Sequence, residues 1–249
     1  MPRALQARDS RPELMDDLTK GGPKLREALV HLRRLNRLFG AAAPTLYGVR
    51  RLWREAGCPR TLSILDVGSG SGDVNRRLLR WALEEGVQLH VTLVDKTEEA
   101  AKEAALYYWK ESRVQIRQAD LFELEADSAD IVTGTQFIHH FEGAELKKAV
   151  QQMLRVSRLG VALNDIHRHW LPWSAVWLAA RLVSRNPYIR HDGPLSVAKG
   201  FRAEDWEKLR QHPGLEGLDY SWRPLFRYAV MVSKSERPSD HGEAEEELH

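Results

Sequence analysis

Residues 63–74 constrain the fold most, because they join a short apolar run to a glycine-rich turn and then to an amphipathic segment. The run suits a buried parallel strand, and a helix that begins near Asp73 would offer free backbone N–H groups to a ligand. Glycine allows the turn to take positive φ and to approach that ligand closely. The stretch therefore predicts a nucleotide-cofactor site between a strand and a helix.

The spacing of the glycines indicates which cofactor the turn can hold. A dinucleotide fingerprint reads G-x-G-x-x-G, and its third glycine, counted from Gly68, would fall on Asp73. A phosphate-binding loop would end in Gly-Lys-Ser or Gly-Lys-Thr, and the turn has no such ending. The pattern from Asp66 to Gly72 is D-x-G-x-G-x-G, which argues against both kinds of phosphate ligand.

That pattern resembles the first motif of class I methyltransferases, which use S-adenosylmethionine (SAM) and release S-adenosylhomocysteine. The resemblance implies that Asp66 lies near the methionine amine of SAM, and that the turn contacts the cofactor through Gly68, Ser69, Gly70 and Gly72. SAM carries a sulfonium and an ammonium but no phosphate, so a carboxylate beside the turn favours it. The alternative is a tight turn without a ligand.

Strand and helix patterns alternate through the chain. Strands are expected at residues 63–67, 88–94, 114–118, 129–133, 160–163, 220–223 and 227–232. Helices are expected at residues 73–85, 97–110, 144–156 and 203–211. This order predicts an α/β fold with a doubly wound, mostly parallel, seven-stranded sheet, Rossmann-like as in the methyltransferases that the chain resembles. Such sheets bind ligands at the carboxyl ends of their strands.

Acidic residues follow the second and third expected strands. Asp95, with Lys96 beside it, is expected to accept hydrogen bonds from ribose hydroxyls, and a helix cap is its alternative role. The resemblance implies that Asp120 contacts the adenine amino group while Leu121 packs on the ring, and the alternative for Asp120 is a surface turn. Thr135, after the fourth strand, completes the expected cofactor contacts.

Residues 135–141, Thr-Gln-Phe-Ile-His-His-Phe, resemble the small-molecule branch of the family, which includes the ubiquinone and menaquinone methyltransferases. The Asn/Asp-Pro-Pro-aromatic motif of enzymes that methylate amino groups of nucleic acids is absent. No carboxylate ends the fourth strand, so Asn164-Asp165 supplies only half of the site found in metal-dependent catechol-type enzymes. We therefore expect neither a metal nor a nucleic-acid partner.

Five histidines follow the fourth and fifth strands and the segment after them. Methyl transfer from SAM mainly requires alignment and exclusion of water, but a hydroxyl acceptor can need a base, and histidine suits that role near neutral pH. We expect His140 or His191 to accept the proton, with Asp165 and His167 orienting the site. A lone histidine in such a loop is more often structural, and His-x-His at 167 and 169 is weak evidence for zinc.

Residues 170–200 form an unusually apolar insertion. A helix of about 14 residues is too short to span a membrane. Its position predicts a lid over an aromatic or lipid-like substrate, with a dimer contact or an interfacial membrane helix as alternatives. Residues 190–196 are expected to form a polar turn that points into the pocket. The expected substrate contacts are His139, Trp173, Trp177 and Arg190.

The chain divides by composition into three parts. Residues 1–60 carry 13 Lys or Arg against 6 Asp or Glu and are expected to form an N-terminal helical cap. Residues 61–235 would form the methyltransferase domain, and residues 236–249 a disordered acidic tail. Cys58 is the only cysteine, so no intrachain disulfide can form. With no apolar N-terminal signal, this favours a cytoplasmic location.

These observations predict transfer of a methyl group from SAM to a hydroxyl of a small apolar aromatic or polyketide-like molecule. Residues 164–169 and 191–197 resemble a bacterial subgroup that is often encoded beside polyketide-forming enzymes. C-methylation of a quinol ring, an RNA methyltransferase and a non-catalytic SAM-binding subunit are the alternatives. A monomer or homodimer without stable membrane insertion is expected.

Overall fold

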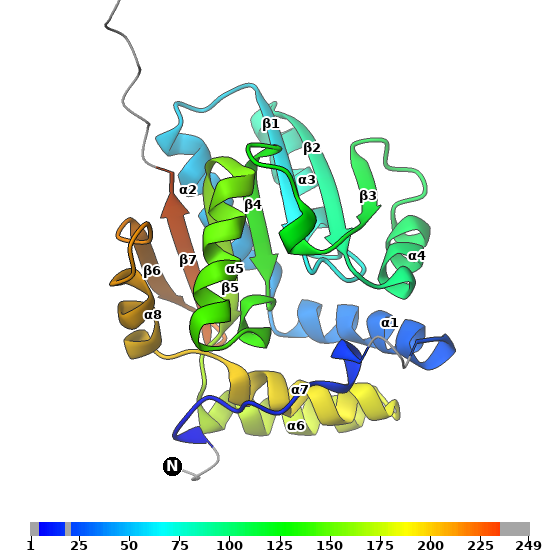
Figure 1. The fold of residues 1–249 in the computed structure, drawn as a ribbon. Coiled ribbons are helices and arrows are strands. Elements are labelled where there is room, and N and C mark those ends of the chain that lie inside the picture. The colour runs from blue at the N-terminus through cyan, green and yellow to red at the C-terminus, as the bar shows by residue number, and fades with distance from the viewer. Residues whose placement is uncertain (1–4, 18–20, 235–249) are drawn as a thin grey trace, which may run out of the picture.

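The computed structural model describes residues 5–17 and 21–234 and is built on one seven-stranded sheet (Figure 1). The strands run in the order β3-β2-β1-β4-β5-β7-β6, and β7 is antiparallel to both β5 and β6, whereas the other pairs are parallel. This confirms the predicted fold class. The strands are β1 Thr61–Val67, β2 Gln88–Asp95, β3 Val114–Gln118, β4 Ala129–Thr135, β5 Ser157–Ile166, β6 Leu218–Arg223 and β7 Arg227–Ser233.

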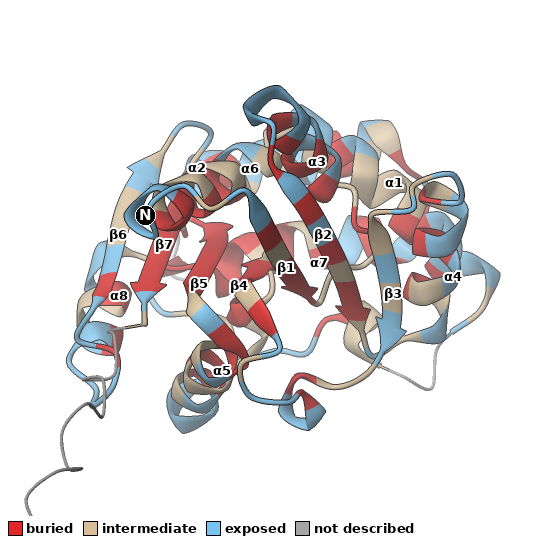
Figure 2. Cartoon of the chain, turned by 90° about the horizontal axis from the view of Figure 1, so that it is seen from above, coloured by how far each residue is buried: buried red, intermediate tan, exposed pale blue. Residues whose placement is uncertain are grey.

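Helices cover both faces of the sheet. α2 (Ala42–Glu55), α3 (Asn75–Glu85) and α4 (Glu98–Tyr107) pack on one face, and α5 (Gly143–Val156) and α8 (Ala203–Arg210) pack on the other. Figure 2 shows the central strands buried along most of their length. A strand covered on both faces has a continuous apolar sequence, so β1 could be predicted from the sequence. α2 packs directly on β5 and β7, although it lies within the expected N-terminal cap.

Three further helices lie across the carboxyl ends of the parallel strands (Figure 1). They are α1 (Pro23–Leu38), α6 (Trp170–Val183) and α7 (Pro187–Lys199), which share a small apolar cluster. The insertion is thus two helices, and the expectation of a polar turn at residues 190–196 is wrong. Asn186 starts α7 because its side chain accepts a hydrogen bond from the Tyr188 N–H, with Pro187 in the first turn.

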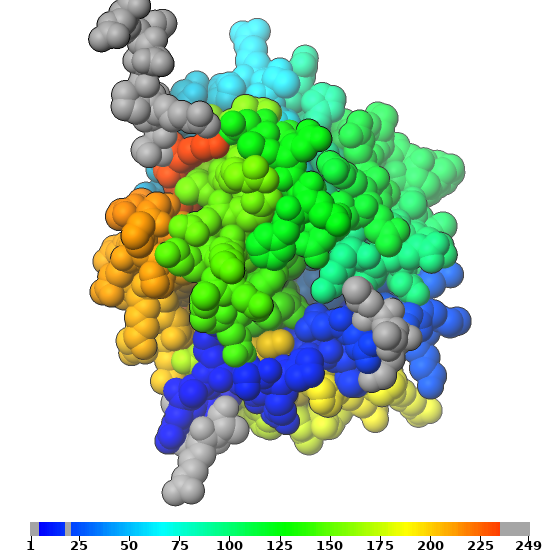
Figure 3. All heavy atoms as spheres, viewed as in Figure 1, coloured from blue at the N-terminus to red at the C-terminus, as the bar shows by residue number. Residues whose placement is uncertain are grey.

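Residues 5–17, here called the N-terminal strap, run along the same end of the molecule and contain the short helix η2 (Leu14–Asp16). Figure 3 shows the strap in dark blue between the green residues that follow β4 and the yellow helices. The Leu14 and Met15 N–H groups donate to the Asp192 carboxylate at 2.9 and 3.0 Å. Arg8 Nε donates to the Lys199 carbonyl at 2.9 Å. The strap is therefore fixed to α7.

Two more short helices follow strands, η3 (Leu121–Glu123) after β3 and η4 (Ile138–His140) after β4. Within the described ranges, no helix has the length and apolar character needed to cross a membrane. The expected acidic tail, residues 236–249, lies outside the described residues.

Candidate active site

A cavity of about 440 Å³ lies at the carboxyl ends of β1, β2 and β4, beneath α1, α7 and the strap. Its size is in the range of small-molecule pockets. One part, here called the turn half, is lined by every residue expected to contact a cofactor except Gly72: Asp66, Gly68, Ser69, Gly70, Asp95, Lys96, Asp120, Leu121 and Thr135. The other part, here called the histidine half, is lined by the strap, η4 and α7, and the leucines of α1 line the cavity as well.

Two glycines of the turn are required by close packing. At Gly68, φ is 60° and a Cβ would lie 2.2 Å from Phe137 Cδ2. At Gly72, φ is 71° and a Cβ would lie 2.4 Å from Leu93 Cδ1. A side chain at either position would be strained and would displace its neighbour. Gly68 lines the cavity, whereas Gly72 lets the turn pack on β2.

The Asp66 carboxylate is buried under the turn. It accepts hydrogen bonds from Asn75 Nδ2 at 2.6 Å and from Thr133 Oγ1 at 2.7 Å. Burial raises the pKa of Asp66 to about 6, against the opposing effect of these two donors. The carboxylate is therefore held in one orientation at the floor of the turn half.

Asp95 accepts hydrogen bonds both from the glycine turn and from the start of α4. Its Oδ2 accepts from the Gly70 N–H at 2.9 Å, and its Oδ1 accepts from the Thr97 N–H and hydroxyl at 3.0 and 2.8 Å. Thr97 in turn is the N-cap of α4, through a hydrogen bond from the Ala100 N–H. Asp95 thus links β2, the glycine turn and the start of α4 while it lines the cavity.

The remaining residues of the turn half differ in whether they already form hydrogen bonds within the protein. Asp120 is the N-cap of η3 and accepts from the Phe122 N–H, and Leu121 beside it is buried. The Thr135 hydroxyl is paired with that of Thr45 on α2 at 2.8 Å. Ser69 Oγ is buried and has no hydrogen-bond partner among the described residues. A buried hydroxyl without a partner is costly, so this atom indicates where a ligand group fits.

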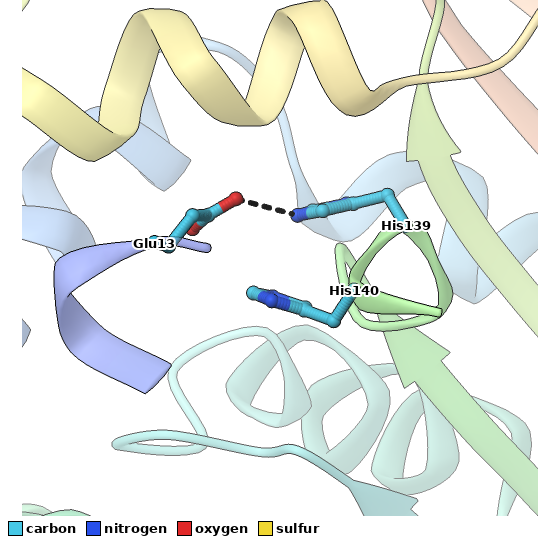
Figure 4. A group of neighbouring side chains, drawn as sticks. All are labelled: Glu13, His139 and His140. Carbon is cyan, nitrogen blue, oxygen red and sulfur yellow. Dashed lines mark ion pairs between the residues drawn. The ribbon is translucent and has the colours of Figure 1, made fainter. Parts of the chain in front are cut away.

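His139, in the histidine half, is buried between two carboxylates, of which Figure 4 shows Glu13. Its Nδ1 lies 2.8 Å from Asp165 Oδ1, and its Nε2 lies 3.4 Å from Glu13 Oε1. Burial by itself lowers the pKa of His139, but the two carboxylates outweigh it and raise the pKa to about 9. His139 is therefore an imidazolium near neutral pH. Asp165, which we expected to help orient the site, contacts His139.

His140 stacks on His139, with ring centroids 4.4 Å apart. Its Nδ1 lies 2.9 Å from Asp16 Oδ2. An Nδ1–H that donates to this carboxylate leaves the lone pair of Nε2 free to accept a proton. His140 and Asp16 both line the cavity. This is the geometry of a base with an orienting carboxylate.

The ligand atoms of Glu13, His139 and His140 lie within 4.8 Å of one another, a spacing that can hold a metal ion. The nearby positive charges oppose the binding of a metal ion at this group. The buried Lys199 Nζ lies 3.8 Å from Glu13 Oε1 and 3.9 Å from Asp16 Oδ2. Since His139 is also protonated, a divalent ion would have to displace one cation and oppose the other. Metal independence therefore stays our prediction.

The contribution of the strap could not be predicted from the sequence. Glu13 and Asp16 reach His139 and His140 across more than a hundred residues of chain, and Ser196 of α7 donates to Glu13 at 3.0 Å. Burial opposes ionisation of Glu13, but the histidines and Lys199 lower its pKa overall. The residues around Glu13 read Arg-Pro-Glu-Leu-Met-Asp, which forms no motif that could have indicated this role.

Arg190 and His191, which we expected at the site, do not lie on the cavity-lining face of α7. The cavity-lining positions of α7 are Ile189, Asp192, Gly193 and Ser196, which share one helical face. Arg190 and His191 are outside that set because residues 190–196 are helical. Arg190 Nε donates to the Ser184 carbonyl at 2.8 Å, and His191 Nδ1 lies 2.7 Å from Asp192 Oδ1 with its ring largely exposed.

His167, Trp173 and Trp177 also do not line the cavity. His167 instead accepts from Trp222 Nε1 at 3.3 Å and packs beside the ring of Tyr228. The two tryptophans belong to α6, which is stacked against α7. The expected lid is therefore formed by α7, α1 and the strap, while α6 is the outer helix.

Residues 64–160 match the family model of a methyltransferase domain. No curated protein matches the chain. The first of the similar solved structures is the citrinin polyketide synthase CMeT domain, with 17% identity and a TM-score of 0.52 over 69% of this chain. The present chain spans 46% of that one.

Two further structures resemble the chain over nearly their whole length. The S-adenosyl-L-methionine-dependent methyltransferase mmp1179 from Methanococcus maripaludis, described as putative, is 15% identical, with a TM-score of 0.59 over 88% of this chain and 98% of its own. The plantazolicin methyltransferase BpumL, in complex with a triazolic desmethylPZN analog and SAH, is 13% identical, with a TM-score of 0.65 over 89% of this chain and 94% of its own. At these identities the similarity is one of fold.

Proposed function

We propose that this chain is a class I SAM-dependent methyltransferase and that it methylates a hydroxyl of a small, largely apolar molecule of aromatic or polyketide-like structure. One observation carries the proposal: a single cavity joins the glycine turn to a histidine that a carboxylate orients. The citrinin and BpumL enzymes support the substrate class only by analogy.

The turn half fits SAM. Ser69 Oγ is a buried hydroxyl that still needs a partner, and Gly68 and Gly70 line the cavity beside it. Asp66 and Asp95 supply two fixed carboxylates for a ligand with positive groups and ribose hydroxyls. Leu121 offers an apolar surface next to Asp120 for a flat ring. When bound, SAM supplies an electrophilic methyl group on its sulfonium.

The histidine half fits an apolar acceptor with one polar end. Leu25, Leu29 and Leu32 of α1 line the cavity, together with Phe137 and Phe141. Apolar walls exclude water and restrict the orientation of the acceptor. Glu13, Asp16 and the stacked histidines supply polar groups to this cavity.

His140 is the residue that we expect to take the proton. The acceptor oxygen forms its bond to the methyl carbon as the carbon–sulfur bond breaks, and the hydroxyl proton moves to His140 Nε2. Asp16 fixes the tautomer through Nδ1 and stabilises the imidazolium that results. His139 is already protonated, so it is a positioning residue that fixes Glu13 and the strap.

Incubation of the chain with methyl-deuterated SAM and a panel of phenols, quinols and hydroxylated polyketides tests the proposal. We expect a labelled product by mass spectrometry, with the methyl group on oxygen by NMR. A methyl group on carbon would establish the C-methylation alternative. SAM binding without turnover of any acceptor would support a non-catalytic SAM-binding subunit.

A further inference from the structure

The outer helix α6 presents its large apolar side chains to solvent. Trp170, Leu171, Trp177, Leu178 and Leu182 have between 40% and 79% of their surface exposed. Their spacing places them on one side of the helix, here called the α6 outer face. An ordinary surface helix turns its apolar side toward the protein, so this arrangement is reversed.

The inner side of α6 is made of small residues. Ala179 and Ala180 are buried against α1 and α7, in a cluster with Ala28, Tyr188 and Ile189. Since this packing does not use the exposed tryptophans and leucines, the fold does not explain their presence. A continuous exposed apolar face indicates a contact with another apolar phase.

The apolar surface continues beyond the start of α6 through a series of ring contacts. Trp170 lies 5.7 Å from His169, His169 stacks on Phe226 at 5.5 Å, and Phe226 lies 6.1 Å from Trp222, all between ring centroids. Trp222 is itself 52% exposed. The surface therefore joins α6 to the β6–β7 hairpin.

The segment that contains α6 carries only positive charges of its own. Residues 166–191 contain no Asp or Glu, and they include Arg181, Arg185 and Arg190 at least partly exposed. The Arg181 guanidinium lies 3.8 Å from the centroid of the Trp177 ring, so a positive charge lies within the apolar face. Such a face requires an anionic partner.

We propose that the α6 outer face docks the protein on the surface of a bilayer that contains anionic lipid. Tryptophan and arginine suit the boundary between acyl chains and headgroups, because each combines an apolar body with a polar or charged end. In a symmetric contact through α6, a second copy would present the same arginines, and residues 166–191 offer no acid to pair them. α6 has 14 residues, so it lies on the membrane and does not span it.

The position of α6 suggests what the docking is for, an inference that rests on the proposed function. A Cβ on Gly193 would lie 3.2 Å from Val176 of α6, and Gly193 lines the cavity. A docked α6 therefore places the cavity one helix layer from the lipid. An apolar acceptor dissolved in the bilayer would then reach the enzyme without crossing water.

Sedimentation of the full chain with vesicles tests the docking without any need for turnover. We expect binding to vesicles of phosphatidylcholine with 30 mol% phosphatidylglycerol, and about tenfold or more weaker binding to phosphatidylcholine alone. The double variant Leu178→Asp, Leu182→Asp should lose binding. Arg181→Glu, Arg185→Glu should lower it about tenfold or more, since each basic residue near the surface contributes about fivefold.

Matched controls on the far side of the fold are Leu83→Asp and Arg80→Glu, which change exposed residues of α3. Both should bind vesicles as the unchanged chain does, and all variants should keep their SAM affinity, which shows that they fold. The proposal is overturned if the unchanged chain does not bind anionic vesicles, or if the α6 variants bind as well as the controls. A dimer that dissociates in the α6 double variant would instead make the face a contact between copies.

Discussion

Replacing His139 by glutamine tests whether this buried side chain holds a proton. Glutamine keeps a polar group between Asp165 and Glu13 but removes the positive charge. The pKa of His139 is raised in the folded chain from 6.5 to about 9. The folded state therefore binds the proton more tightly than the unfolded state, so this contribution to stability is full below pH 6.5 and is lost as the pH rises through about 9.

The magnitude follows from the size of the shift. Each unit of pKa difference corresponds to about 1.4 kcal/mol, so the proton on His139 contributes about 3 kcal/mol at pH 6. We expect the free energy of unfolding of the unchanged chain, relative to His139→Gln, to fall by that amount between pH 6.5 and 9.5.

Urea unfolding at half-unit steps of pH, followed by circular dichroism, measures this difference. His212→Gln is the matched control, because it makes the same substitution at an exposed histidine. A difference for His139→Gln that stays flat from pH 6.5 to 9.5 would refute the reasoning, because it would mean that His139 is neutral between its two carboxylates.

Three further predictions concern binding and catalysis. Asp95→Ala should weaken SAM binding by about 1–3 kcal/mol in calorimetry, because it removes a hydrogen-bonded carboxylate that also holds the turn. Unchanged SAM affinity, or tight NAD binding, would contradict the cofactor assignment. Turnover should survive EDTA, and a loss restored by Mg²⁺ or Zn²⁺ would make the Glu13–His139–His140 group a metal site. His140→Ala should lower kcat by about 10²–10⁴-fold with SAM affinity unchanged, whereas His191→Ala should leave kcat unchanged. Asp16→Asn should shift the pH–rate profile. Equal kcat in the His140 and His191 variants would contradict the assignment of His140 as the base.

The sequence predicted the sheet and the turn half because both depend on local signals. A buried parallel strand is an apolar run, and a turn that approaches a ligand needs glycine, so Gly68 and its strand could be recognised without any long-range information. The residue after each strand then falls at the same edge of the sheet. Asp95 and Asp120 could be located in this way before the structure was known.

The histidine half could not be predicted as well because its residues meet only through tertiary packing. Glu13 and Asp16 carry no motif, and they reach the histidines because Asp192 binds the backbone of η2. The roles within residues 170–200 were misassigned for a related reason. Composition identified an apolar helix, but it does not tell which side of α6 faces the protein, and the helical periodicity of α7 was obscured by Gly193 and Pro194.

The contact between the strap and α7 sets an order of events during synthesis. Leu14 and Asp192 are 178 residues apart in the chain, so the strap leaves the ribosome long before its partner exists. Contacts of such high sequence separation form late, because a long loop must close first. The turn half needs only residues 61–135, so a nascent chain should acquire the glycine turn well before it can assemble His140 with Asp16. Until α7 is made, the carboxylates of the strap remain in water, so the strap is placed late although it is synthesised well before α7.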